Sequence, residues 1–72
     1  QKRFAQSILF FKDVSNTYPD DPKAADALLK MGYAYANLGQ NDNARFYLQR
    51  LVEQYPASHS ARLARERLQN LP

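Results

Sequence analysis

The dipeptide Tyr-Pro occurs twice in this chain, and the two copies, Tyr18-Pro19 and Tyr55-Pro56, lie 37 residues apart. The same shift also superimposes apolar or small residues along the chain: Ser7 on Ala44, Phe11 on Leu48, Val14 on Leu51, Ala24 on Ala61 and Met31 on Leu68. A period of this length is typical of repeats made of two helices, so it predicts a helical solenoid. Strands compete poorly, because glycine is rare and β-branched residues are few and scattered.

The chain has 72 residues, of which 44% are hydrophobic, so we expect one small domain with a thin core. It has no cysteine and one histidine, His59, which excludes disulfides, thiolate chemistry and a zinc site. Two glycines are too few for phosphate-binding loops, and no apolar run approaches the ~20 residues of a membrane span. We therefore expect no enzyme activity, metal, cofactor or membrane insertion. Because the chain opens with Gln1, we expect it to be part of a longer protein, with any signal peptide upstream.

The first of four expected helices covers residues 2–17 and ends before Pro19, because proline disfavours helical backbone in the residue before it. Its apolar residues spread beyond a single stripe: Phe4, Ile8, Leu9, Phe10, Phe11, Val14 and Tyr18. The 37-residue shift aligns this helix with the third, so it corresponds to the second helix of an incomplete repeat. Since part of its apolar surface then lacks cover, we expect the chain to self-associate or exchange helices at high concentration.

The second helix is expected over residues 22–38. Asp21 is expected to cap it and Pro22 to occupy the first turn, where no backbone donor is needed. This capping role explains Asp20-Asp21 better than a catalytic carboxylate pair does. The apolar face follows a 4-3-4-3 spacing: Ala24, Leu28, Met31, Tyr35 and Leu38. Gly39 suits the residue after the helix, because it takes left-handed backbone at little cost.

The third helix is expected to be capped by Asn41 or Asp42 and stopped by Pro56. Its apolar side consists of Ala44, Leu48, Leu51, Val52 and Tyr55. Because both Tyr-Pro pairs recur at the structural period, we interpret them as helix ends rather than as a ligand motif. His59 then lies in the solvated turn that follows.

The fourth helix is expected to begin at Ser58 or Ser60 and to reach residue 69, with Ala61, Ala64, Leu68 and Leu71 facing inward. One apolar stripe and one charged side suit a capping helix at the end of a stack. The charged side supplies a secondary candidate site, the basic residues Arg62, Arg65 and Arg67. A solvated face is the favoured explanation, an acidic protein partner the next, and nucleic acid the last. The net charge of +3 lies mainly at the two chain ends, without interleaved exposed aromatics.

Residues 24–56 resemble a tetratricopeptide repeat. Nine residues stand at that family's characteristic spacings: Leu28, Met31, Gly32, Tyr35, Gly39, Ala44, Leu48, Leu51 and Pro56. Gly32 and Ala44 are small where two helices are expected to cross closely, and Leu28 replaces the usual tryptophan. The resemblance implies an all-α stack of about four helices in a single domain over 1–72. Residues 1–19 form the second helix of an incomplete repeat, 21–56 one full repeat, and 58–71 a capping helix.

Two longer runs, residues 18–32 and 55–68, resemble the C-terminal region of the periplasmic cell-division coordinators of the Tol–Pal system, the YbgF/CpoB family. That resemblance implies a parent chain with a signal peptide and an N-terminal coiled coil, located in the periplasm. It implies protein partners, namely TolA and the septal peptidoglycan-synthesis machinery. The nearest alternative is a scaffold repeat of a BamD-like outer-membrane assembly lipoprotein. A small basic nucleic-acid-binding helical domain is a weaker alternative from another functional class.

The candidate partner-binding residues lie on the second helix, beside its apolar stripe. In stacks of helix pairs the first helix of each pair lines the concave side, where ligands bind. The positions that match this groove in the repeat family are Asp26, Leu29, Tyr33, Ala36 and Asn37. The alternative is that so few repeats form too shallow a groove, with Tyr33 packing on the fourth or first helix.

Overall fold

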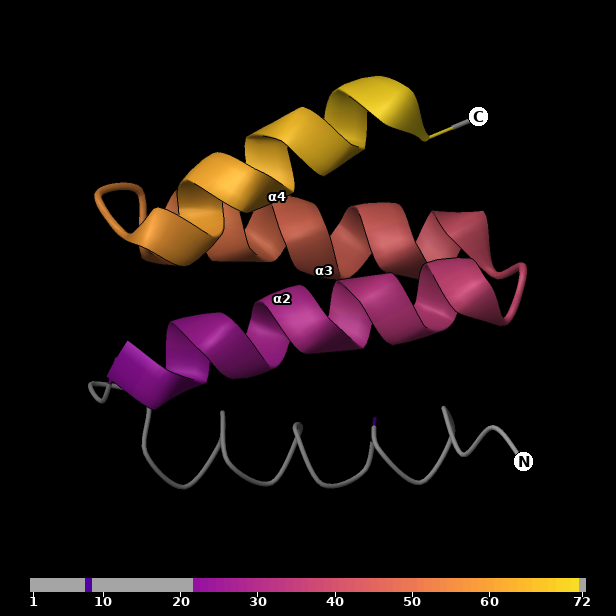
Figure 1. Ribbon diagram of the computed structural model, residues 1–72, viewed down its shortest axis with the longest axis horizontal. Coiled ribbons are helices and arrows are strands. Elements are labelled where there is room, and N and C mark those ends of the chain that lie inside the picture. The colour runs from indigo at the N-terminus through magenta and orange to yellow at the C-terminus, as the bar shows by residue number, and fades with distance from the viewer. Residues whose placement is uncertain (1–7, 9–21, 72) are drawn as a thin grey trace.

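The computed structural model describes residue 8 and residues 22–71. This part of the chain contains three helices and no strand: α2 (Pro22–Asn37), α3 (Asn41–Gln54) and α4 (His59–Asn70). α2 and α3 form an antiparallel hairpin. α4 packs antiparallel to α3, so it runs in the same direction as α2 (Figure 1). α4 also contacts α2, so each helix touches the other two. The predicted all-α helical stack is confirmed.

The predicted helix over residues 2–17 lies outside the described residues, apart from Ile8, which is helical and buried. The same holds for the Asp21 cap, for Tyr18-Pro19 and for the apolar surface on which the self-association prediction depends. Pro22 is the first residue of α2, as predicted. Its missing N–H costs nothing there, because the first turn of a helix has no internal partner for it.

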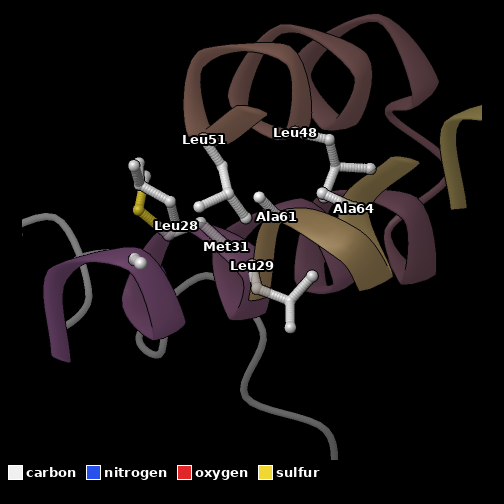
Figure 2. Close-up of a cluster of buried hydrophobic side chains, with 8 residues drawn as sticks. Leu28, Leu29, Met31, Leu48, Leu51, Ala61 and Ala64 are labelled. Carbon is white, nitrogen blue, oxygen red and sulfur yellow. The ribbon is translucent and has the colours of Figure 1, made fainter. Parts of the chain in front are cut away.

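The core is built from all three helices. α2 contributes Ala25, Leu28, Leu29 and Met31, α3 contributes Leu48 and Leu51, and α4 contributes Ala61 and Ala64. Figure 2 shows Leu48 and Leu51 pointing from α3 into this cluster. The largest fully buried side chains are Leu28, Met31, Leu48 and Leu51, and each stabilises the fold by roughly 1.5–3 kcal/mol. Because α4 meets the cluster with two alanines, its backbone can lie close to the hairpin.

The crossing of α2 and α3 depends on Gly32. A Cβ atom at this position would lie 2.5 Å from Cδ2 and 2.6 Å from Cγ of Leu48. Leu48 has no exposed surface, so its side chain has no free space into which to move. The small residue predicted here is therefore required by the close approach of the two helices.

α2 ends in a Schellman motif centred on Gly39. The N–H of Gly39 donates to the Ala36 carbonyl at 3.0 Å, and that of Gln40 donates to the Tyr35 carbonyl at 2.9 Å. Gly39 has φ +79°, the left-handed conformation predicted for it. Leu38, which was expected inside, is 41% exposed. Because the chain reverses directly after it, Leu38 lies at the edge of the hairpin.

The capping role predicted for Asn41 or Asp42 is wrong. α3 begins at Asn41, so its N-cap position is Gln40, whose side chain makes no capping hydrogen bond. The Gln40 side chain instead accepts a hydrogen bond from Asn43 Nδ2 at 2.9 Å. Asp42 lies in the first turn, where a carboxylate favours the positive end of the helix dipole, and it pairs with Arg45 at 3.3 Å.

A tight turn with Pro56 in its second position joins α3 to α4. The Ser58 N–H donates to the Tyr55 carbonyl at 3.0 Å, which closes the turn. Ser58 Oγ accepts from the Ala61 N–H at 3.0 Å, so Ser58 is the N-cap of α4, one of the two residues predicted for that role. Arg65 Nη2 donates to the Pro56 carbonyl at 2.8 Å, which ties α4 back to the turn.

Candidate partner-binding face

The residues predicted to line a groove on α2 differ in accessibility. Asn37 is exposed, whereas Asp26, Tyr33 and Ala36 are half-buried. Leu29 is only 5% exposed and belongs to the core cluster, so its assignment to the binding surface is corrected. Leu29 shares that cluster with Ala61 and Ala64 of α4, which also packs on α2.

Tyr33 joins the two candidate sites that the sequence kept separate. Its ring packs against the core cluster, and Arg67 Cζ of α4 lies 5.1 Å from the ring centroid. This geometry is a cation–π contact. Tyr33 therefore contacts the fourth helix, through Arg67, which is one part of the alternative considered above. We define the α2–α4 face as Asp26, Tyr33, Ala36 and Asn37 of α2 together with Arg67 of α4.

Both polar ends of the α2–α4 face are oriented by contacts within α2. Asn37 Nδ2 donates to the Tyr33 carbonyl one turn earlier, at 2.9 Å. Asp26 pairs with Lys30, with 3.0 Å between Oδ2 and Nζ and about half of each side chain exposed. An exposed pair of this kind adds little stability, roughly 0.3–0.5 kcal/mol, but it restricts where the carboxylate points. Asn37 keeps its amide oxygen as an acceptor for a partner.

The three arginines of α4 are all exposed, but they differ in their contacts. Arg65 is bound to the Pro56 carbonyl, and Arg67 lies over Tyr33. Arg62 is exposed. Phosphate backbones are bound by several cations arranged along one path, and two of these three side chains are engaged within the chain. The geometry therefore does not favour the nucleic-acid alternative.

An aromatic row crosses from α2 to the outer side of α3, and the sequence analysis missed it. The rings of Tyr35 and Tyr47 stack with centroids 5.3 Å apart and planes 5° apart. Phe46 meets Tyr47 edge-on at 5.0 Å and is 55% exposed. The exposure of Phe46 could have been found from its position in the helix. It lies two residues from both Ala44 and Leu48, and residues two apart point to nearly opposite sides of a helix.

Two open hollows of the surface are lined by residues other than those of the α2–α4 face. One follows the outer side of α3 from Phe46 to Gln54, and the other surrounds the loop from Gly39 to Asn43. Within residues 8 and 22–71, no group of three or more His, Cys, Asp or Glu side chains is placed to hold a metal ion. In the same part of the chain, no helix combines the length and apolar character needed to cross a membrane.

Comparison with protein families identifies the type of repeat. Residues 26–58 match the tetratricopeptide repeat family. This region holds a tetratricopeptide repeat. The match spans most of α2, all of α3 and the turn that leads to α4, so the repeat's helix pair is the α2–α3 hairpin. Tetratricopeptide repeats are typically non-catalytic modules that bind protein partners. No curated protein matches the chain.

Proposed function

We propose that this chain is a non-catalytic protein–protein interaction module of the periplasmic Tol–Pal system. In this proposal it binds TolA and helps to coordinate outer-membrane constriction with septal peptidoglycan synthesis. The tetratricopeptide repeat over residues 26–58 supports the general role. The similarity of residues 18–32 and 55–68 to the Tol–Pal-associated coordinators supports the particular partner and the periplasmic location.

The observation that carries the interaction role is the α2–α4 face itself. It combines a half-buried aromatic ring, Tyr33, with the exposed amide of Asn37 and the exposed cation of Arg67. Tyrosine and arginine are among the residue types enriched at the few positions that dominate binding energy at protein interfaces. Ala36 adds no bulk between Tyr33 and Asn37, so a partner's backbone can approach α2 closely.

The test is calorimetric titration of purified TolA into the 72-residue chain and into single variants. Asn37→Ala removes an exposed amide and is expected to weaken binding about three- to tenfold, the effect of one lost neutral hydrogen bond. Gln49→Ala, on the outer side of α3, is the matched control and is expected to leave the affinity unchanged. If TolA gives no heat of binding with the unmodified chain, the Tol–Pal assignment is wrong.

Tyr33→Ala is expected to have the larger effect, a loss of roughly 30-fold in affinity. Because the Tyr33 ring also packs against the core, this variant loses stability as well as a contact surface. Its unfolding curve must therefore be measured alongside its affinity. If Asn37→Ala and Gln49→Ala lose affinity for TolA equally, the binding surface lies elsewhere on the molecule.

A further inference from the structure

The outer side of α3 is a helix face with one large apolar residue, Phe46, which is 55% exposed. Six exposed polar residues lie within about two turns of it: Asp42, Asn43, Gln49, Arg50, Glu53 and Gln54. We infer that a second copy of this chain packs on this side, with the two α3 helices antiparallel about a twofold axis at Phe46. The inference does not depend on the proposed function, because none of these residues belongs to the α2–α4 face.

The ring of Phe46 is supported from beneath and open above. It meets Tyr47 edge-on at 5.0 Å, and Tyr47 in turn stacks on Tyr35 at 5.3 Å. An open hollow begins at Phe46 and continues along the outer side of α3 to Gln54, so a second ring has space to lie beside the first. A ring that is already held in place loses little conformational freedom when it is buried. At a twofold axis a residue meets its own copy, and two aromatic rings are a favourable pair there.

The charges on either side of Phe46 favour the antiparallel arrangement. Asp42 lies four residues before Phe46 and Arg50 four residues after it, so both share its side of the helix. In an antiparallel pair centred on Phe46, Asp42 of each copy meets Arg50 of the other, and the symmetry gives this contact twice. A parallel pair would instead place Asp42 against Asp42 and Arg50 against Arg50, which repel.

Both charged groups are available to a second copy. The Asp42 side chain is fully exposed, and its contact with Arg45 at 3.3 Å leaves further acceptor sites on the carboxylate. Within residues 22–71 the ion pairs are Asp26–Lys30 and Asp42–Arg45, so Arg50 has no carboxylate partner there. One helix face from each copy makes a small interface, and we therefore expect a weak dimer with a Kd of roughly 0.1–1 mM.

The first experiment is sedimentation equilibrium of the 72-residue chain from about 20 μM to about 2 mM at low ionic strength, where charge screening is weakest. The unmodified chain is expected to follow a monomer–dimer equilibrium. Phe46→Ser is expected to weaken the dimer about tenfold or more, and its fold is expected to persist because more than half of Phe46 is exposed. Asp42→Arg and Arg50→Asp should each weaken it about tenfold or more, because each replaces two attractive pairs with two repulsive ones. Circular dichroism checks that every variant is folded.

The second experiment mixes the two charge variants. Asp42→Arg has two cations at the facing positions and Arg50→Asp has two carboxylates, so a mixed pair restores both attractive contacts. Unlabelled Arg50→Asp is titrated into labelled Asp42→Arg, and nuclear magnetic resonance is expected to show saturable shifts centred on Phe46, with an affinity close to that of the unmodified dimer. Arg62→Asp is the matched control, because it makes the same change of net charge at an exposed position of α4. Its mixture with Asp42→Arg is expected to bind at least threefold more weakly, since only one of the two contacts is attractive.

Three results overturn the inference. The unmodified chain remains monomeric up to about 2 mM, or Phe46→Ser associates as strongly as the unmodified chain, or the mixture of Asp42→Arg with Arg50→Asp binds no more tightly than the control mixture. Association that survives Phe46→Ser would assign it to another surface, such as the apolar residues of the helix expected over residues 2–17.

Discussion

Replacing Gly32 by alanine tests the helix crossing that defines the α2–α3 hairpin. In an ordinary helix interior this change stabilises by about 1 kcal/mol, because alanine has the higher helix propensity. Here the new Cβ would lie 2.5 Å from Cδ2 of Leu48, a fully buried side chain. Overpacking of this kind costs about 1–3 kcal/mol, and the upper part of that range applies because Leu48 cannot move aside. We therefore expect Gly32→Ala to lower the free energy of unfolding by about 1–2 kcal/mol.

Truncating Leu48 removes the clash and should turn the destabilising effect of Gly32→Ala into a stabilising one. Leu48→Ala alone should cost about 3–5 kcal/mol, as truncation of a buried leucine does. In that background Gly32→Ala should become stabilising by about 1 kcal/mol, since only the gain in helix propensity remains. The coupling between the two positions is then about 2–3 kcal/mol.

The assay is urea unfolding of all four proteins by circular dichroism, in one fixed concentration of a stabilising osmolyte that keeps the weaker variants folded. The unmodified protein and the three variants form a complete double-mutant cycle. If Gly32→Ala stabilises the protein equally in both backgrounds, the close approach of α2 and α3 at this position does not exist.

Three further substitutions test the helix ends and the aromatic row. Ser58→Ala should cost about 1 kcal/mol and speed hydrogen exchange in the first turn of α4, because the Ala61 N–H loses its capping acceptor. Gly39→Ala should lower the free energy of unfolding in urea by about 1 kcal/mol. The whole loss should come from the backbone φ of +79°, because an added Cβ would meet no atom within 4 Å. An unchanged unfolding midpoint would contradict this backbone conformation. Tyr35→Ala should lower the free energy of unfolding by about 2–3 kcal/mol, less than the loss of a fully buried aromatic side chain. A double-mutant cycle with Tyr47→Ala should give an interaction energy of about 0.5–1.5 kcal/mol for the stacked rings.

The parts of the fold that depend on neighbours in sequence could be predicted, and those that depend on distant contacts could not. Gly39 and Ser58 were found at the ends of their helices because each role depends on a few adjacent residues. The cap of α3 was placed one or two residues too late, which is the usual uncertainty of a helix boundary. Leu38 continues the apolar spacing of α2 and was therefore expected inside, but it is exposed. Periodicity along α2 does not show where the helix that packs against it ends.

The candidate site was predicted in part for the same reason. Repeat spacing selected Tyr33 and Asn37 on α2, and the charge pattern selected Arg67 on α4. Nothing local to either segment shows that Arg67 lies over Tyr33, because that contact exists only after α4 packs against α2. Leu29 is buried in a cluster built by all three helices, which one helix's spacing does not show, so the sequence alone placed it on the surface.

The central claim is that a protein partner binds the α2–α4 face, and backbone amide shifts of the labelled 72-residue chain on adding TolA test it most directly. The account predicts that the largest shifts fall on Tyr33, Asn37 and Arg67. The outer side of α3, at Gln49 and Glu53, should remain unaffected. Largest shifts on the outer side of α3, with the α2–α4 face unchanged, would contradict the account.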